Sequence, residues 1–266
     1  MRKHITGFSN PTVKYLRSLR DKKHRKRSGQ FLVEGLRLLE DARSTGRLPT
    51  TLVMAEGRAA HELLARLEAD VVAAGGEVIA TSPDILSKIT GKDNAQSVVG
   101  VFDEWDTGLA ALDRSAAPIW LVAQALRDPG NLGTMLRTGD AVGAGGLILI
   151  DDCADPFSAE AVRASMGAVF TVPLAQARWE EFLPWLRGGS GQLVAASLRD
   201  AVPYRGAAYA APCFILVGNE SQGLPEEYEA ACDLRVTMPM RGRADSLNAA
   251  VAGAVLAYEV LAGLEA

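Results

Sequence analysis

Apolar runs and amphipathic segments alternate along the first hundred residues, a pattern typical of alternating strands and helices. Strand-like runs occur at 31–35, 51–55, 77–82 and 97–105. Segments with helical periodicity separate them at 36–46, 58–76 and 83–90. Small and turn-forming residues at 106–117 predict a linker. Residues 1–105 are therefore predicted to form a compact α/β domain.

A second α/β series begins with the continuous apolar run at 119–126, which is typical of a central strand in a parallel sheet. A glycine-containing loop follows, then a predicted helix at 134–142 and a strand at 146–152. The loop lies at the carboxyl end of the first strand, where open α/β sheets bind ligands. The rest of this domain, 118–266, continues the pattern, with helices expected at 158–170, 179–189 and 226–232 and strands at 169–174, 193–198, 213–220 and 234–240.

The last helical segment, at 246–260, is made almost entirely of small apolar residues. Its only polar side chains are Ser246, Asn248, Tyr258 and Glu259. A helix that is apolar on nearly every face must be buried on most sides, and this run is too short to span a bilayer. We expect it to pack against its own domain, a second subunit or both. Ser246 or Asp245 is placed to cap its N-terminus.

Charge is unevenly distributed in this chain of 266 residues, which is 48% hydrophobic and carries a net charge of -4. Residues 1–27 hold ten Lys or Arg against one acid, Asp21. A basic helix is predicted at 11–26, with Val13, Leu16 and Leu19 on its apolar side and Tyr15 as a further candidate for it. We interpret it as a phosphate contact for RNA or DNA; the alternative is a solvated helix without a partner. The candidate RNA contacts are Lys22, Lys23, Arg25, Lys26 and Arg27.

Cysteine and histidine usage limits the chemistry. Cys153, Cys213 and Cys232 lie in or beside apolar segments at wide spacing, which predicts reduced thiols in a cytoplasmic protein. The three histidines all precede residue 62, so a Ser-His-Asp catalytic triad or a Cys-His catalytic dyad is not expected in the second domain. No Cys/His spacing suits a metal, and no apolar signal segment begins the chain. We expect neither a metal site nor a membrane partner.

Three loops at predicted strand ends share one chemical character. They read DPGNLGTMLR at 128–137, VGNESQGLP at 217–225 and MPMRGRADSLN at 238–248. Each combines glycine, which allows tight turns or close approach to a ligand, with Asn, Glu, Arg or Ser. Taken singly, each loop is explained by ordinary turn chemistry. The first loop is not a dinucleotide fingerprint, and the second is not a P-loop.

Taken together and in this order, the loops resemble the three signature motifs of the SpoU (TrmH-type) RNA 2'-O-ribose methyltransferases, within the SPOUT superfamily. The resemblance covers 119–261. A weaker resemblance, carried by FLVEGLRLLEDA and QSVVGVF, relates the first domain to a ribosomal-protein-like RNA-binding domain. The family implies an α/β fold whose C-terminal domain has a parallel sheet and a deep trefoil knot. It also implies a homodimer, formed through that domain, that shares the active site.

The resemblance assigns roles to individual positions. Catalytic positions of the three motifs fall on Asn131, Arg137, Glu220, Ser246 and Asn248. Positions that hold the methyl donor, S-adenosyl-L-methionine, fall on Gly218, Met238 and Leu247. The chain departs from the family pattern at Ser221, where glycine is common, and at Ala249-Ala250, where Val-Ser is common. Neither departure touches the five catalytic positions, so we expect activity.

The acceptor implied by the resemblance is an RNA ribose 2'-hydroxyl, in ribosomal RNA rather than transfer RNA because of the extra RNA-binding domain. Direct methyl displacement needs no metal. Our hypothesis is that Arg137 clamps the target nucleotide's phosphate and polarises the hydroxyl. The alternatives are a transfer RNA 2'-O-methyltransferase, a non-catalytic RNA-binding protein on the same fold, and a dehydrogenase-like nucleotide binder, which the missing glycine fingerprint disfavours.

Overall fold

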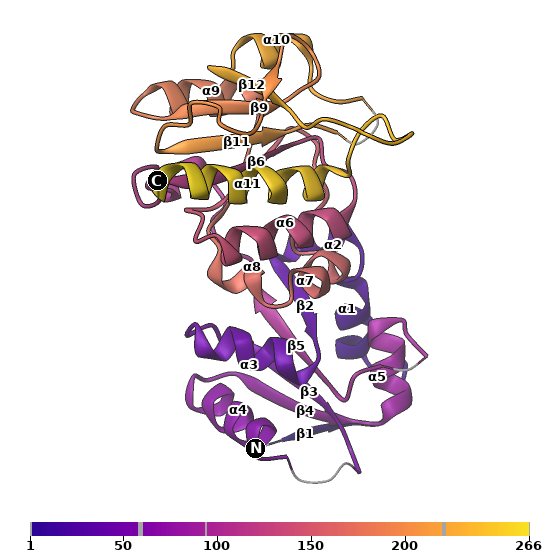
Figure 1. Ribbon diagram of the computed structural model, residues 1–266. Helices are drawn as coiled ribbons and strands as arrows, with labels where there is room; N and C mark the ends of the chain where they lie inside the picture. The colour runs from indigo at the N-terminus through magenta and orange to yellow at the C-terminus, as the bar shows by residue number, and fades with distance from the viewer. Residues whose placement is uncertain (1, 58–60, 94, 220–221, 266) are drawn as a thin grey trace. The chain divides into compact units, whose positions relative to one another are not determined.

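The computed structural model describes residues 2–57, 61–93, 95–219 and 222–265 (Figure 1). The chain divides into two compact units. The N-terminal unit comprises Met1–Trp105 together with Phe157–Phe170, and the C-terminal unit comprises Asp106–Pro156 and Thr171–Ala266. The second unit thus begins where the linker is predicted. The segment Phe157–Phe170, which the sequence places in the second domain, groups with the first unit.

The N-terminal unit is built on a five-stranded sheet with the order β1-β4-β3-β5-β2. Its strands are β1 (Lys3–Ile5), β2 (Gln30–Glu34), β3 (Thr51–Ala55), β4 (Glu77–Thr81) and β5 (Val98–Asp103). Strands β1, β4 and β3 are parallel, and β5 runs antiparallel to β3 and β2. The predicted α/β alternation is present, and β1 is an additional edge strand.

Helices of the N-terminal unit cover the sheet. They are α1 (Pro11–Ser18), α2 (Lys22–Ser28), α3 (Leu36–Ser44), α4 (Glu62–Ala73), α5 (Pro83–Thr90) and α7 (Ala159–Ser165). Apolar side chains of α1 and α5, such as Leu16 and Ile85, form one core with Val53, Ile79 and Val99 of the sheet. The buried side chains of Val13, Leu16 and Leu19 confirm the predicted apolar side of the basic segment, whereas Tyr15 is 40% exposed and does not belong to it.

The prediction of one continuous basic helix at 11–26 is wrong, because the structure has two helices there, α1 and α2. The carboxyl oxygen of Asp21 accepts a hydrogen bond of 2.7 Å from the backbone N–H of Lys23 and caps a new helix. The helix predicted at 158–170 is also broken, at Met166 and Gly167, which have φ values of 51° and 96°. The chain then forms the short helix α8 (Ala168–Thr171), so the strand predicted from residue 169 begins only at Leu174.

Aromatic packing explains why Phe157–Phe170 groups with the N-terminal unit. The ring centroid of Phe157 lies 4.9 Å from that of Phe31 and 4.8 Å from that of Trp105. The Phe170 and Phe102 rings are 5.4 Å apart. Burial of large aromatic rings is a major source of packing energy, and periodicity alone does not reveal which rings will meet.

The C-terminal unit contains a seven-stranded sheet with the order β10-β12-β9-β11-β6-β7-β8. Every pairing in it is parallel, which confirms the predicted parallel sheet. Its strands are β6 (Ile119–Gln124), β7 (Leu147–Ile150), β8 (Leu174–Ala177), β9 (Gln192–Ala196), β10 (Val202–Pro203), β11 (Cys213–Val217) and β12 (Leu234–Thr237). The short edge strand β10 is not predicted from sequence. The trefoil knot stays a prediction.

Helices lie on both faces of this sheet, as Figure 1 shows. They are the 3-10 turn η1 (Leu109–Ala111) and the helices α6 (Pro129–Ala141), α9 (Trp179–Arg187), α10 (Glu226–Ala230) and α11 (Ala249–Glu265). Aromatic side chains of α9 and α10 pack on Trp120 and Phe214 of one face. Helix α11 packs against α6, β11 and β6 on the other face. None of the helices in the described ranges is long and apolar enough to cross a membrane.

Two helix starts differ from the sequence prediction and change the site. Helix α6 begins at Pro129 rather than at 134, because Asp128 caps it by accepting from the N–H of Asn131 at 2.7 Å. The cap of α11 is Asn248 and not Ser246 or Asp245. Its Oδ1 accepts from the N–H groups of Ala250 and Val251 at 2.9 and 3.2 Å. Both corrections place a predicted catalytic Asn at a helix start.

Candidate active site

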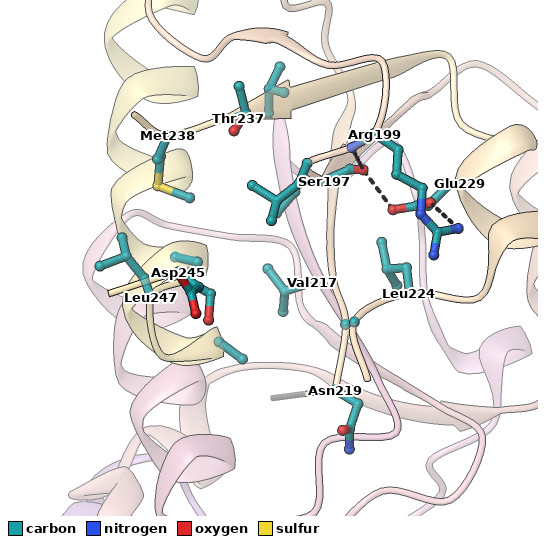
Figure 2. Close-up of a pocket in the computed structure, with 18 of the residues that line it drawn as sticks. Ser197, Arg199, Val217, Asn219, Leu224, Glu229, Thr237, Met238, Asp245 and Leu247 are labelled. Atoms are coloured by element: carbon teal, nitrogen blue, oxygen red, sulfur yellow. Dashed lines mark hydrogen bonds and ion pairs between the residues drawn. The ribbon is translucent and has the colours of Figure 1, made fainter. Parts of the chain in front are cut away.

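A cavity of about 370 Å³ lies in the C-terminal unit, beyond the carboxyl ends of β9, β11 and β12 and against the start of α11 (Figure 2). Such a position is where parallel α/β sheets bind ligands. Gly218, Met238 and Leu247, the three predicted donor-binding residues, all line it, and so does Ser246. Met240, Ala249 and Ala252 add apolar surface. The structure thus brings the second and third sequence motifs to one cavity.

Gly218 allows two backbone segments to approach closely at this cavity. A Cβ at this position would lie 2.6 Å from the carbonyl carbon of Gly223 and 2.7 Å from the backbone nitrogen of Leu224. Backbone atoms cannot yield at such distances, so any side chain would push the segments apart. The loop is held further by the N–H of Gly223, which donates to the carbonyl of Asn219 at 2.9 Å. Gly218 is therefore needed for the close backbone packing of the cavity wall, and not for flexibility in a turn.

Asn219 ties the second motif to the strand that precedes the first. Its Nδ2 donates to the carbonyl oxygen of Ala125 at 2.8 Å, and its Oδ1 accepts from the N–H of Gln222 at 3.1 Å. Ala125 itself has a positive φ of 48°, an uncommon conformation for a residue with a side chain. Glu220, a predicted catalytic residue, and Ser221 lie outside the described residues.

The first and third motifs meet through their Asn side chains. Asn248 Nδ2 donates to Asn131 Oδ1 at 2.9 Å, across 117 residues of sequence. Asn131 lies in the first turn of α6, and Asn248 precedes α11. Because these two helices pack together, the amide pair is fixed by the helix starts. Three of the five predicted catalytic residues, Asn131, Ser246 and Asn248, are therefore clustered at or beside the cavity.

Arg137 is placed differently. It lies on the exposed side of α6, six residues beyond Asn131, which is about 9 Å along a helix axis. Within the described ranges its guanidinium makes no hydrogen bond or ion pair, so the structure does not join it to Asn131 or Asn248. An exposed, unpaired guanidinium is available to bind a phosphate.

A half-buried thiol lies at the strand ends next to the first motif. Cys153 Sγ accepts a hydrogen bond of 3.3 Å from the N–H of Leu126. Burial raises the pKa of the Cys153 thiol to about 11, so it stays protonated at neutral pH. Burial likewise raises the pKa values of Cys213 and Cys232 to about 12. All three cysteines are free, and none has the low pKa of a nucleophilic thiol.

The cavity also contains polar residues that the sequence did not single out. Ser197 follows β9, and Glu229 lies on α10; both line the cavity and are buried. Ser197 was detectable in principle, because it follows an apolar strand at the ligand-binding edge of the sheet. No sequence pattern indicated that Glu229 is a site residue, because it belongs to an acidic run, EEYE, that is typical of a solvated helix. In the structure, Glu229 and its neighbour Tyr228 are the buried residues of α10.

The predicted RNA contacts in the N-terminal unit divide into two groups. Lys22, Lys23, Lys26 and Arg27 are exposed on α2. Arg25 is only 4% exposed, and its guanidinium donates to the carbonyl oxygens of Leu19 and Arg20 at 2.9 and 2.8 Å. Arg25 therefore holds the end of α1 rather than presenting its charge, and its assignment as an RNA contact is wrong. The other four assignments stay predictions.

The parallel sheet, the cavity at its carboxyl edge and the paired motifs are the arrangement that the resemblance to SPOUT methyltransferases predicts. Comparison with known proteins gives the family. The SpoU rRNA Methylase family model matches residues 118–258, and a model of the MRM3-like substrate binding domain matches residues 10–100. The chain belongs to the SpoU rRNA methylase family.

Several relatives match over nearly the whole length of both chains. The 23S rRNA (guanosine(2553)-2'-O)-methyltransferase of Bacillus subtilis is 30% identical, over 97% of this chain and 99% of its own. An AdoMet-bound rRNA methyltransferase structure from Sinorhizobium meliloti has a TM-score of 0.92 and 40% identity, covering 98% of each chain. The SpoU methyltransferase AviRb of Streptomyces viridochromogenes, in complex with AdoMet, has a TM-score of 0.88 and 28% identity, over 97% of this chain and 99% of its own.

Proposed function

We propose that this protein transfers a methyl group from S-adenosyl-L-methionine to a ribose 2'-hydroxyl in ribosomal RNA. The observation that carries the proposal is the convergence of the three motifs. Gly218, Met238 and Leu247 line one cavity, and Asn131 and Asn248 are hydrogen-bonded beside it. The family membership and the 2'-O-methyltransferase names of full-length relatives support it.

Ribosomal RNA is favoured over transfer RNA by the domain organisation. Several relatives that match over both units carry rRNA names, and one is named as a tRNA/rRNA methyltransferase. The structure concerned with 2-OH methylation of C/U34 on tRNA covers 55% of this chain, with a TM-score of 0.51. The N-terminal unit therefore distinguishes this chain from that enzyme, and we assign substrate binding to it. Its exposed basic residues on α2 would bind phosphates, while the C-terminal unit presents the donor.

The cavity residues fit the donor chemically. The volume of about 370 Å³ lies in the range of small-molecule sites. Met238 and Leu247 offer apolar surface to a purine ring, and Gly218 keeps backbone N–H and C=O groups within reach of its edges. No group of three His, Cys, Asp or Glu side chains suited to a metal occurs within the described ranges. We propose the donor as co-substrate, and the prediction that no metal takes part is retained.

Bound S-adenosyl-L-methionine supplies an electrophilic methyl group. The protein must then align the ribose oxygen with it and exclude water. We assign Arg137 to the phosphate of the target nucleotide, where its charge also polarises the 2'-hydroxyl. Asn131, Ser246 and Asn248 would position the nucleotide and the motif loops. We assign Glu220, which the motif resemblance marks as catalytic, to orienting Arg137 or the loops.

A homodimer formed through the C-terminal unit remains part of the proposal. Helix α11 is apolar along its length, yet Val251 and Tyr258 are 46% and 54% exposed in the single chain. A second subunit covering this side would bury them, as the composition of the helix predicts. The exposed Arg137 on the neighbouring helix α6 would then lie near the partner. We place the activity in the cytoplasm, which suits three free thiols.

The test is methyl transfer by the purified protein. The protein is incubated with tritium-labelled S-adenosyl-L-methionine and, separately, with ribosomal RNA and transfer RNA lacking their own modifications. We expect label in ribosomal RNA only, and alkaline hydrolysis to leave an uncleaved dinucleotide at the modified ribose. Label in transfer RNA, or on a base, would contradict the proposal. Donor binding without any transfer would favour the non-catalytic RNA-binding alternative.

A further inference from the structure

A polar pair forms the cavity wall that faces the apolar side chains. Figure 2 shows Ser197 and Glu229 across the cavity from Met238 and Leu247. Ser197 Oγ donates to Glu229 Oε1 at 2.6 Å and accepts from the N–H of Arg199 at 2.9 Å. These two bonds fix the hydroxyl proton toward Glu229. The pair therefore offers only hydrogen-bond acceptors to a ligand.

The second carboxylate oxygen of this pair lacks a hydrogen bond. Glu229 is 6% exposed, and its Oε2 is buried without a hydrogen-bond partner among the described residues. The guanidinium of Arg199, at 3.4 Å, balances its charge, but that side chain is 59% exposed. Buried carboxylate oxygens are normally hydrogen-bonded, because leaving one unsatisfied is costly. Since Glu229 lines the cavity, a ligand bound in the cavity is the natural hydrogen-bond donor to this oxygen.

We propose that Glu229 Oε2 and Ser197 Oγ accept hydrogen bonds from the vicinal ribose hydroxyls of the nucleoside donor. This inference rests on the proposed function and adds the residues that recognise the donor's sugar. Two neighbouring acceptors match two neighbouring O–H donors, and a carboxylate is a common partner of ribose hydroxyls in nucleotide sites. Glu229 is then a donor-binding residue that acts away from the transferred methyl group.

Two other groups of the donor fit the pair less well. A cationic ammonium group would compete with Arg199, which already lies 3.4 Å from Glu229 Oε2. The exocyclic amine of adenine belongs to an aromatic ring, and the apolar side chains of Met238 and Leu247, which suit such a ring, lie on the opposite side of the cavity. The ribose, which is polar and joins the two ends of the donor, suits the polar wall.

The experiment measures binding of S-adenosylhomocysteine, the stable product, by isothermal titration calorimetry. The variants are Glu229→Gln, which removes the charge, and Ser197→Ala, which removes the hydroxyl. Glu226→Gln is the matched control: Glu226 lies on the same helix and pairs with the same Arg199 at 3.9 Å, but its side chain is 90% exposed. Thermal unfolding of each variant verifies that it is folded. We expect the Kd to rise roughly 10-fold or more for Glu229→Gln and less for Ser197→Ala, and to stay unchanged in the control.

Analogues of the ligand identify the group that is recognised. With 2',3'-dideoxy S-adenosylhomocysteine, wild type and Glu229→Gln should bind with the same reduced affinity. With 5'-methylthioadenosine, which lacks the amino acid, the penalty of Glu229→Gln should persist. An equal penalty on the dideoxy analogue would overturn the inference, because Glu229 would then act through the fold. A penalty lost only on the N6-methyl analogue would overturn it in favour of the adenine amine.

The binding experiment distinguishes failure of the ribose assignment from failure of the proposed function. If wild type binds S-adenosylhomocysteine and Glu229→Gln binds it equally well, the ribose assignment is wrong while the proposed function stands. If folded wild-type protein binds neither S-adenosylhomocysteine nor S-adenosyl-L-methionine, the proposed function fails and the ribose assignment fails with it.

Discussion

Asn248 and Asn131 are joined by a hydrogen bond of 2.9 Å, from Nδ2 to Oδ1, although 117 residues separate them. The orientation of the Asn248 amide follows from its surroundings. Its Oδ1 accepts from the N–H groups of Ala250 and Val251, which leaves Nδ2 as the atom that faces Asn131. One side chain thus caps α11 and connects the third motif to the first. The Ala249-Ala250 departure leaves this cap intact, because the cap uses backbone N–H groups, those of Ala250 and Val251, and no side chain at 249 or 250.

Asn248→Asp separates these two tasks. A carboxylate keeps the acceptor at the N-terminus of α11, where negative charge is favoured, but it cannot donate to Asn131. We expect the melting temperature to stay close to that of wild type and kcat to fall roughly 10-fold or more, because the first motif loses its tether. Asn248→Ala should lose the cap as well, at a cost of about 1 kcal/mol. Turnover of Asn248→Asp within twofold of wild type would show that the connection is dispensable.

Arg137→Lys tests the exposed guanidinium on α6. Lysine retains the charge but loses the planar fork that binds a phosphate through two hydrogen bonds. We expect kcat to fall roughly 100-fold, since misplacement of the reacting hydroxyl is costly, and the Kd for S-adenosyl-L-methionine to stay unchanged. Arg205→Lys, an exposed arginine outside the cavity, is the control. Near-wild-type turnover of Arg137→Lys with unchanged RNA affinity would exclude a phosphate clamp at this position.

Much of the fold was predictable, because period-2 and period-3.6 patterns report burial directly. The apolar runs at β6 and β11 mark the centre of the sheet, and both strands are fully buried. Helix starts were less predictable. At 128–133 the glycines suggested a loop, whereas the cap by Asp128 and the helix-compatible Pro129 begin α6 there. Local capping bonds outweighed the low helix propensity of glycine.

The site was predictable only where sequence motifs exist. Gly218, Met238 and Leu247 were identified by resemblance, and the structure places them around one cavity. Ser197 and Glu229 belong to no motif, and their meeting depends on how α10 packs beside β9. The same limit affects Arg25, whose sequence context matches that of its exposed neighbours. Its burial follows from the turn between α1 and α2, which the charge pattern does not reveal.

Neutralising the exposed charges of α2 tests the RNA contact. The quadruple variant changes Lys22, Lys23, Lys26 and Arg27 to Gln. If each neutralises a phosphate, the slope of log K against log salt should become less steep by about 3, at 0.7–0.9 per phosphate, while donor binding is unaffected. Truncation of residues 1–27 is unsuitable, because it would remove the β1 edge strand and the buried side chains of α1.

Arg25→Gln is the matched control for that variant. It removes one positive charge from the same helix, but a buried one that caps α1 through carbonyl oxygens. We expect a lower melting temperature and an unchanged salt slope. A salt slope that is altered by Arg25→Gln and retained in the quadruple variant would reverse the assignment of contacts.

Gly218→Ala tests the close approach of backbone segments at the cavity. The added Cβ would meet backbone atoms of Gly223 and Leu224 at 2.6–2.9 Å, so the loop must shift. We expect the affinity for S-adenosylhomocysteine to fall at least roughly 10-fold and the protein to lose roughly 1–3 kcal/mol of stability. Gly253→Ala is the contrast, because its Cβ would find ordinary contacts at 3.5–3.7 Å inside α11. It should stabilise the protein by about 0.5–1 kcal/mol, and equal effects of the two substitutions would contradict the steric explanation.

The pH dependence of stability should report the half-buried thiol of Cys153. Burial raises the pKa of this thiol from 9.0 to about 11. Between these values the folded state keeps a proton that the unfolded state releases, so the free energy of unfolding must fall as pH rises. The contribution is fully present below pH 9, decreases between pH 9 and 11, and amounts to roughly 2 kcal/mol. Urea unfolding of wild type and Cys153→Ala at pH 8, 9, 10 and 11 should therefore give two curves that converge at high pH. The thiols of Cys213 and Cys232 titrate in both proteins and cancel in the comparison, so parallel curves would mean that Cys153 is not desolvated in the folded protein.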